Sequence, residues 1–329
     1  MKKQTKIAAA LSAAAFMMMV SGLPVYAASY GWVTEGDAKV YYDEDGYLTT
    51  DAWRKRGEDW FYLGEDGQIV KSKKIDEYYV DDEGKMVTNA WVELKNEEDP
   101  DSPETPDTFW YYFEKDGKSA VSKWVKFDSK WYYFDESGHM ATGKTEIDGA
   151  TYYLGTEKDG FMRTGWIRLE ENSHAPGASE SWYYFNSDGK MVTTQYDKKI
   201  DGSYYTFIDG KMQTGWVLMP SKSDVTDSNA ASPRITDYQY YGAAGDGKRA
   251  EGFRSIEGIS GIHAADEVYT FYFKAGKPYV SDKKGNSLFT INAKKYAFSD
   301  LGIMQTGRQI ANVANDEIAN FYFGEDGIV

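Results

Sequence analysis

A short unit that recurs from about residue 30 to the end of the chain limits the fold more than any other feature. Its clearest copy, WVKFDSKWYYFDESGHMATG, spans residues 124–143. A tryptophan opens one segment, a polar turn follows, and a block of aromatic residues forms a second segment before a turn with glycine. Aromatic and β-branched residues on both sides of such turns indicate strands, so each unit predicts a β-hairpin. The turn glycines number twelve, at a commonest spacing of 21 residues: 46, 67, 84, 117, 138, 160, 189, 210, 247, 276, 302 and 327.

The units must pack on one another, because an isolated two-stranded hairpin is only marginally stable in water. We therefore predict an all-β solenoid of about twelve stacked hairpins, elongated in shape. Two polar insertions, at 97–107 and 170–181, support this prediction because both fall at the hairpin tip, where added residues leave the stacked backbone undisturbed. The opening and second-strand tryptophans are 7 residues apart in Trp53/Trp60 and Trp124/Trp131, 19 apart in Trp91/Trp110 and 16 apart in Trp166/Trp182.

The two ends of the chain differ from the middle. Residues 1–27 combine three lysines, an apolar stretch and a small-x-small site, which is the pattern of a secretory signal peptide. Residues 28–252 carry the well-formed repeats, and residues 253–329 carry degenerate ones without tryptophan. We expect a secreted protein, with no membrane insertion after signal cleavage. The C-terminal part is predicted to be a structural cap or a protein-contact region and not a ligand-binding part.

Composition excludes several classes of function. The net charge of −15 repels nucleic acid and anionic lipid and favours cationic ligands. Without cysteine the chain cannot use disulfides, so its stability must come from packing, and aromatic residues make up 16% of it. The acidic turns, such as 43–45, could instead be calcium ligands, but they lack the spacing of calcium β-rolls.

Catalytic motifs are missing from the sequence. It contains no cysteine nucleophile, no G-x-S-x-G, no H-E-x-x-H and no phosphate-binding glycine loop. The three histidines, His139, His174 and His263, have no metal-ligand spacing and are expected to be solvated loop residues. We therefore expect a protein that is not an enzyme and uses no cofactor or metal.

The unit resembles the choline-binding or cell-wall-binding repeats of Gram-positive surface proteins and phage lysins. The motifs that carry the resemblance are Thr-Gly-Trp at 164–166 and 214–216, Trp-Tyr-Tyr-Phe at 110–113, 131–134 and 182–185, and Gly-x-Met at 138–140, 189–191 and 210–212. The resemblance implies a location at the cell wall or cell surface, and non-covalent attachment to a choline-bearing polymer of the teichoic-acid type. Related repeats in glucan-utilising enzymes imply carbohydrate binding as the alternative.

The resemblance also implies where the ligand binds: in a cage of two aromatics from one repeat and one from the next, with a methionine nearby. Carried over to this sequence, the cages are Trp53, Trp60 and Tyr78 with Met86; Trp91, Trp110 and Tyr132 with Met140; Trp124, Trp131 and Tyr152 with Met162; and Trp166, Trp182 and Tyr204 with Met212. Trp216 opens a fifth cleft whose second wall would be Tyr238 or Gln239. In three other units Glu77, Thr151 and Ser203 stand at the second-strand tryptophan position.

The paired tryptophans are the sharpest functional signal. They occur only in some units, while the hairpin persists without them, so we interpret them as residues that the fold does not need. Aromatic faces recognise a quaternary ammonium, which has no proton to donate. The rival hypotheses are stacking of the same indoles on the sugars of a glucan or exopolysaccharide, and an adhesin whose inserted loops contact a protein partner.

Overall fold

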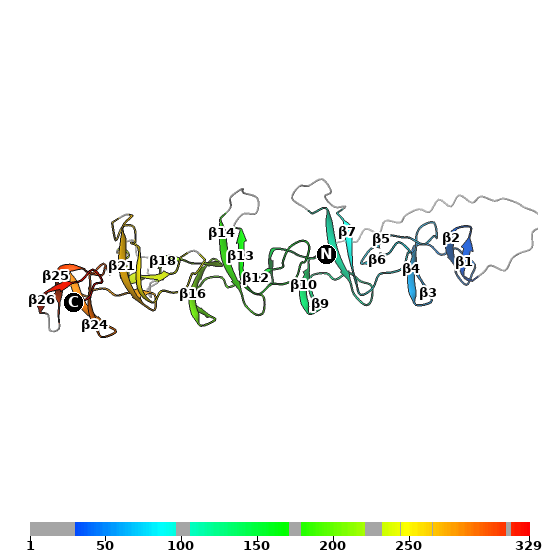
Figure 1. Ribbon diagram of the computed structural model, residues 1–329. Coiled ribbons are helices and arrows are strands. Elements are labelled where there is room, and N and C mark those ends of the chain that lie inside the picture. Colours follow the sequence, from blue (N-terminus) through cyan, green and yellow to red (C-terminus); the bar gives the residue numbers. More distant parts are fainter. Residues whose placement is uncertain are drawn as a thin grey trace, which may run out of the picture. The chain divides into compact units, whose positions relative to one another are not determined.

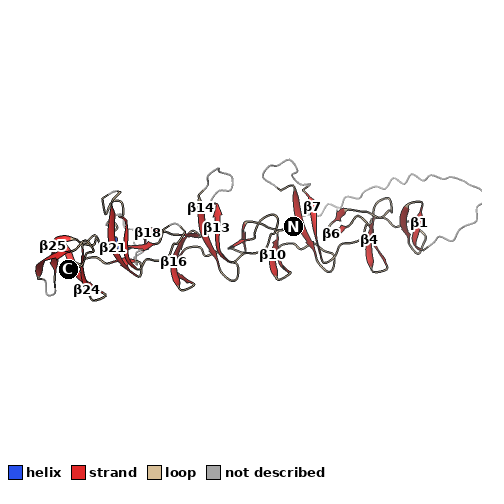
Figure 2. Ribbon diagram, viewed as in Figure 1, coloured by secondary structure: helices blue, strands red, loops and turns tan. Residues whose placement is uncertain are grey.

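The computed structural model describes residues 30–96, 106–170, 179–220, 232–243, 245–264, 266–313 and 317–329. The predicted signal peptide lies outside this part of the chain. In Figures 1 and 2 the described chain consists of strands joined by turns. Its single helical element is the short 3₁₀ helix η1 (Ile235–Asp237). The chain divides into two compact units, residues 1–123 with 134–140, and residues 124–133 with 141–329.

The first unit consists of successive antiparallel hairpins. Each hairpin pairs two strands that are neighbours in the sequence. The hairpins are β1 (Gly31–Glu35) with β2 (Ala38–Tyr42), β3 (Ala52–Arg56) with β4 (Asp59–Leu63), β5 (Lys73–Ile75) with β6 (Tyr78–Val80), and β7 (Ala90–Lys95) with β8 (Thr108–Phe113). The hairpin of β9 (Lys123–Phe127) and β10 (Lys130–Phe134) straddles the division between the units.

The second unit continues the same pattern, with two short third strands and one four-stranded sheet. Its elements are β11 (Lys144–Ile147), β12 (Ala150–Tyr153), β13 (Gly165–Glu170), β14 (Glu180–Phe185), β15 (Gln195–Ile200), β16 (Ser203–Ile208), β17 (Lys211–Met212), β18 (Gly215–Leu218), β19 (Tyr238–Tyr241), β20 (Gly252–Glu257), β21 (Val268–Lys274), β22 (Lys277–Pro278), β23 (Asn286–Ile291), β24 (Lys294–Phe298), β25 (Gly307–Asn312) and β26 (Ile318–Phe323).

The described residues thus form twelve hairpins, as the turn glycines predict, and the prediction of an all-β fold of stacked hairpins is confirmed. Both insertions fall between the paired strands of one hairpin, since Lys95 pairs with Thr108 and Glu170 pairs with Glu180. The boundary predicted at residue 252 is not the division between the compact units, and it stays a prediction.

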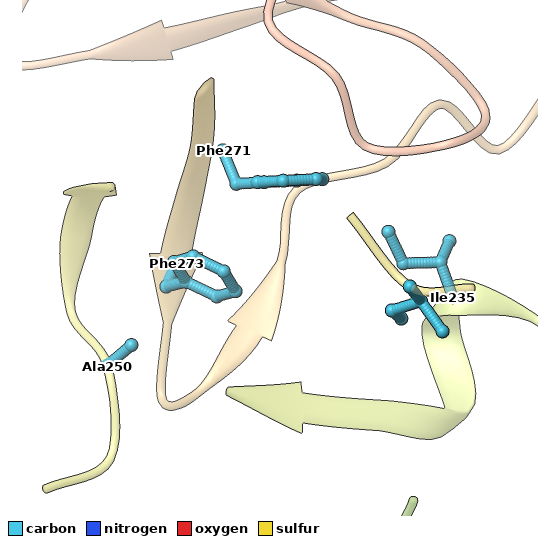
Figure 3. Packing of buried hydrophobic residues seen from close by; sticks show 5 residues of the cluster. Ile235, Ala250, Phe271 and Phe273 are labelled. Atoms are coloured by element: carbon cyan, nitrogen blue, oxygen red, sulfur yellow. The ribbon is translucent and has the colours of Figure 1, made fainter. Parts of the chain in front are cut away.

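In eleven of the twelve hairpins, one residue at or next to the end of the second strand lies in the core. These positions are fully buried, and burial of one such side chain stabilises the fold by about 1.5–3 kcal/mol. Figure 3 shows one of the resulting clusters, in which Phe271 and Phe273 lie near Ile235 and Ala250. The fully buried set comprises Leu63, Val80, Phe113, Phe134, Leu154, Phe185, Phe207, Tyr241, Phe273, Phe298 and Phe323.

The turns between hairpins are built as the sequence predicts, from an acidic residue and a glycine. Asp81 Oδ1 accepts hydrogen bonds from the backbone N–H groups of Glu83 and Lys85, at 2.9 and 2.8 Å. Gly189 has a φ of 81° and packs so tightly that a Cβ would lie 2.2 Å from Met162 Sδ. Glycine is required there both for the backbone angle and for the close approach.

Candidate aromatic cages

The opening tryptophan occupies a constant register in its hairpin, opposite a tyrosine of the second strand. Trp53 pairs with Tyr62, and Trp166 pairs with Tyr184. Because side chains of directly paired residues lie on the same face of a hairpin, the indole rests against this tyrosine. The ring centroids are 5.3 Å apart in the first pair and 5.1 Å apart in the second.

The most complete cage lies between the β13–β14 hairpin and the next one. Trp166 and Trp182 meet almost at right angles, at 84° and 6.4 Å, and Tyr205 lies 4.8 Å from Trp166. Together with Met212 and Asp246 they line a cleft of about 290 Å³. Three aromatic rings and a thioether therefore line one cleft.

The third wall of this cage is Tyr205, whereas the sequence analysis placed Tyr204 there. The fully buried residue of the strand is Phe207, so residues 204–207 take the places that Trp-Tyr-Tyr-Phe takes in the neighbouring hairpin. Tyr204 then stands at the second-strand tryptophan position that the sequence analysis gave to Ser203. The reason is that packing of the buried phenylalanine sets the register, and β15 also contains a bulge between Gln195 and Lys198.

The structure brings two residues of the cage predicted at Trp53 into contact. Tyr78 of the next hairpin lies 5.3 Å from Trp53, edge to face. Trp60, on the second strand, is 40% exposed. The backbone N–H of Met86 donates a 2.8 Å hydrogen bond to the Trp60 carbonyl, so the expected methionine adjoins this wall.

In the second unit, the structure likewise brings two residues of the cage predicted at Trp124 into contact. Tyr152 of the next hairpin lies 4.9 Å from Trp124. Trp131 is 41% exposed, and its carbonyl accepts a 2.8 Å hydrogen bond from the N–H of Met162. Neither indole is sealed inside the stack, since Trp124 is half-buried.

The structure places the residues of the remaining predicted cages less uniformly. In the first unit Trp91 lies 6.5 Å from Trp110 at 72°, and 5.4 Å from Phe134. Met140 donates its N–H to the Trp110 carbonyl at 2.8 Å. Tyr132, the predicted third wall, belongs to the second unit, where its ring lies 6.5 Å from Phe161.

Trp216 belongs to a hydrophobic cluster instead of a cage with two tryptophans. It lies 5.2 Å from Tyr240, its partner in the register, and 5.1 Å from Phe271. Its Nε1–H donates a 3.0 Å hydrogen bond to the carbonyl of Glu257. Of the two predicted second walls, Tyr238 packs at the edge of the same cluster and Gln239 is buried.

The opening tryptophans also stabilise the stack, which differs from the interpretation that the fold does not need them. Trp166 packs against the cluster of Val192, Tyr205 and Phe207, with 5.6 Å between its ring and that of Phe207. Trp124 packs in the same way against the cluster around Leu154. In the pairs Trp53/Trp60 and Trp124/Trp131 the two tryptophans are therefore unequal: the opening one is half-buried, and the second-strand one is exposed.

A backbone hydrogen bond that links successive hairpins was not predicted from the sequence. After most of the glycine turns, the residue two positions beyond the glycine donates its N–H to the carbonyl at the second-strand tryptophan position of the preceding hairpin. The same bond occurs where no tryptophan is present, from Ser119 to Glu77 and from Met191 to Thr151, at 2.7 and 2.8 Å. The spacing of Gly-x-Met was the available signal. This bond holds successive hairpins in register and fixes the methionine beside the cage.

Cationic side chains of the protein lie over aromatic rings in or next to the predicted cages. Lys126 Nζ lies 5.7 Å from the centroid of Trp131, and Lys118 Nζ lies 5.9 Å from that of Tyr78 while it pairs with Glu77. At the interface after Tyr204 the guanidinium of Arg249 lies 4.1 Å above that ring. Cations therefore already contact aromatic faces in this molecule, as the chemistry of such faces favours.

Arg249 belongs to a polar network that fills its interface. It forms a 3.0 Å ion pair with Asp197, which also accepts a 3.0 Å hydrogen bond from the hydroxyl of Tyr241. That hydroxyl contacts Thr206 Oγ1 at 2.7 Å as well. Burial raises the pKa of Tyr241, with the negative charge of Asp197 acting in the same direction.

Two of the histidines are buried, which corrects the expectation that they are solvated. His139 is 8% exposed and stacks on Phe109, with ring centroids 3.7 Å apart. His263 is 9% exposed, accepts a hydrogen bond at Nδ1 from the N–H of Ile259, and contacts the carbonyl of Leu301 through Nε2. The third, His174, lies outside the described residues. Both buried histidines serve packing, because the turns fold them back onto the hairpins.

Within the described residues no group of three His, Cys, Asp or Glu side chains is placed to hold a metal ion. The acidic turn residues that could have been calcium ligands are used as turn caps, as at Asp43, whose Oδ1 accepts the N–H groups of Asp45 and Tyr47. In the same part of the chain, no helix has the length and apolar character needed to cross a bilayer.

Comparison with known proteins identifies the repeat. A model of the choline-binding repeat matches residues 121–166, and a model of a putative cell wall binding repeat matches residues 178–191. A model of flagellin protein matches residues 3–91, and the described part of that range forms hairpins of the kind found in the rest of the first unit.

The curated relatives are much longer proteins. Glucosyltransferase-I of Streptococcus downei is 26% identical over 313 residues, which make up 90% of this chain and 17% of that protein. Glucosyltransferase-S of Streptococcus mutans is 27% identical over 261 residues, or 74% of this chain and 14% of that protein. The chain therefore corresponds to less than a fifth of either enzyme.

Solved structures from Streptococcus pneumoniae share the fold. The modular autolysin LytC, in complex with a synthetic peptidoglycan ligand, matches with a TM-score of 0.51 and 21% identity, covering 84% of this chain and 52% of LytC. CbpJ matches with a TM-score of 0.51 and 19% identity, covering 91% of this chain and 99% of CbpJ. The matched models thus identify repeats of the choline-binding or cell-wall-binding type within residues 121–166 and 178–191, and the solved structures show the same fold.

Proposed function

We propose that this protein is a secreted, non-catalytic, cell-wall-binding protein that attaches to choline-bearing polymers of the teichoic-acid type through its aromatic cages. The observation that carries the proposal is the cleft formed by Trp166, Trp182 and Tyr205 beside Met212. The matched repeat models support the same ligand class.

The shape of the cage favours a compact cation. Trp166 and Trp182 form a corner at 84°, so a rounded trimethylammonium group can contact both faces and Tyr205 at once. The carboxylate of Asp246 also lines the cleft, although it lies 3.3 Å from Lys248 Nζ. The net charge of −15 attracts a cationic guest from a distance.

A single cage is a weak anchor. Each aromatic face contributes about 0.5–2 kcal/mol to cation binding, so three faces reach about 4 kcal/mol and a dissociation constant near 1 mM. Several cages on one chain bind a polymer with repeated choline far more tightly, because each bound group raises the effective concentration of the next. Repetition then serves attachment as well as folding.

Glucan binding is the second candidate, and the glucosyltransferase relatives favour it. Trp60 and Trp131 are about two-fifths exposed, and an exposed indole can stack on a sugar ring. A flat ring uses one face, however, and gains less from the perpendicular corner of Trp166 and Trp182. The adhesin hypothesis depends on the insertions around 97–105 and 171–178, which lie outside the described residues.

Two resins separate the candidates. The purified protein is loaded on a tertiary-amine resin and on dextran, and each is then challenged with free choline. Retention on the amine resin with release by choline supports the proposal, and a Trp182→Ala variant should then elute at lower choline. Retention on dextran alone would support glucan binding, and retention on neither would shift the assignment to protein contacts.

A further inference from the structure

Two hairpins carry a lysine at the opening position where their neighbours carry tryptophan. Lys74 pairs with Tyr79 and Lys144 pairs with Tyr153, which is the register that Trp53 keeps with Tyr62. The lysine therefore leaves the backbone at the place, and on the face, from which an opening indole would extend.

The following hairpin presents the same kind of ring to the lysine as to the tryptophan. Tyr111 and Tyr183 stand two residues before a fully buried phenylalanine, as Tyr205 stands before Phe207. Lys74 Nζ lies 4.6 Å from the centroid of Tyr111, and Lys144 Nζ lies 5.3 Å from that of Tyr183. At the tryptophan-bearing interface, the ring centroids of Trp166 and Tyr205 are 4.8 Å apart.

The second indole is absent at the same two places. The residues at the second-strand tryptophan position are Glu77 and Thr151, as the inter-hairpin hydrogen bonds from Ser119 and Met191 establish. A guest at these interfaces would contact one aromatic wall in place of three. The ammonium group of Lys74 or Lys144 already lies over that wall.

We propose that Lys74 and Lys144 are built-in substitutes for the cationic guest. Each ammonium occupies the aromatic face that a choline group uses at the tryptophan-bearing interfaces, keeps the two hairpins in contact, and excludes a cationic guest by occupancy and like charge. The inference rests on the proposed function and adds a rule to it. The choice between tryptophan and lysine at the opening position decides which interfaces bind choline. It therefore also sets the spacing of the choline-binding sites along the chain.

Lys118 and Lys126 do not follow this rule, and their positions explain why. Neither stands at an opening position. Lys118 is held by an ion pair with Glu77 and lies 5.9 Å from Tyr78, and Lys126 lies 5.7 Å from Trp131. Both are farther from the rings than Lys74 and Lys144, and the opening tryptophan that they adjoin remains in place.

The test adds the missing walls at one lysine interface. The double variant Lys144→Trp and Thr151→Trp places two indoles beside Tyr183 and Met191, so calorimetric titration with choline should find about one more equivalent bound than in the wild type. The matched control is Lys190→Trp, which adds an indole at a turn where the replaced lysine contacts Asp188. The control should bind the wild-type number of equivalents.

A second variant keeps the test decisive if the double variant does not fold. Lys144→Met removes the charge at similar length, and choline should then shift the NMR signal of the Tyr183 ring, which it leaves unshifted in the wild type. A choline-dependent shift of Tyr183 in the wild type, or an unchanged stoichiometry in a folded double variant, would overturn the inference while leaving the proposed function intact. If the wild type binds no choline, the proposed function is wrong. If the folded double variant also binds no choline, the inference is wrong as well.

Discussion

The two tryptophans of one cage should respond differently to truncation. In the cage of the β9–β10 hairpin, Trp131 is 41% exposed, whereas Trp124 is half-buried and packs at 5.3 Å from Tyr133 and 4.9 Å from Tyr152. Truncation of a fully buried tryptophan to alanine costs about 3–5 kcal/mol. Since Trp124 is only half-buried, we expect Trp124→Ala to lower the free energy of unfolding by about 2 kcal/mol, scaled from that range. Trp131→Ala should lower it by less than about 1 kcal/mol, as for an exposed position.

Choline binding should show that Trp131 is a wall of the cage although it adds little to stability. Loss of the Trp131 face removes about 0.5–2 kcal/mol of binding energy, which weakens binding at that cage by about 2- to 30-fold. The assay is chemical denaturation of both variants without ligand, followed by choline titration of each folded protein. Because hairpin arrays unfold through nearest-neighbour units, the signal should be read near the variant, from the Tyr152 ring. If Trp131→Ala destabilises the fold as much as Trp124→Ala does, the outer indole is a core residue and the division of roles is wrong.

Three further outcomes follow from the structure. Gly189→Ala adds a clash with Met162 to the strain of a side chain at a φ of 81°. It should therefore lower the melting temperature more than Gly165→Ala, where φ is 84° but no atom lies near the added Cβ. Equal melting temperatures of the two variants would contradict the close packing at Gly189. Because burial raises the pKa of Tyr241, the unfolded chain loses the phenolic proton at a lower pH than the folded protein does. The stability contributed by this proton is therefore fully present below about pH 10 and falls as the pH rises above it. Tyr241→Phe should reduce this loss of stability at alkaline pH in denaturation curves, and an unchanged pH dependence would exclude the Tyr241 hydroxyl as its source. Combining Trp182→Ala with Trp131→Ala should lower the choline concentration that elutes the protein from an amine resin by more than either change alone, since attachment is multivalent; elution at the wild-type concentration would exclude both cages.

The hairpins could be predicted from the sequence because their determinants are local. Turn glycines, acidic turn residues and alternating aromatics define each unit within about twenty residues, and the stacking then follows from the need to bury one face. The inserted segments were placed correctly at the hairpin tips for the same reason: they interrupt a local pattern without changing the residues on either side.

The errors arose where packing between hairpins decides the answer. Tyr205 replaces Tyr204 as a cage wall because the burial of Phe207 fixes the strand register, and a four-letter motif with a missing tryptophan does not show this. The burial of His139 likewise depends on the distant ring of Phe109. The structural role of the opening tryptophans was missed because other hairpins tolerate lysine at that position, and the lysine there reaches the same tyrosine by a different interaction.

The most direct measurement of the central claim is the set of intermolecular NMR contacts of bound choline. If the cages hold the cation, the N-methyl protons should show nuclear Overhauser effects to the indole of Trp182 and to the ring of Tyr205, and none to Tyr183. Binding without any contact to these aromatic rings would contradict the account.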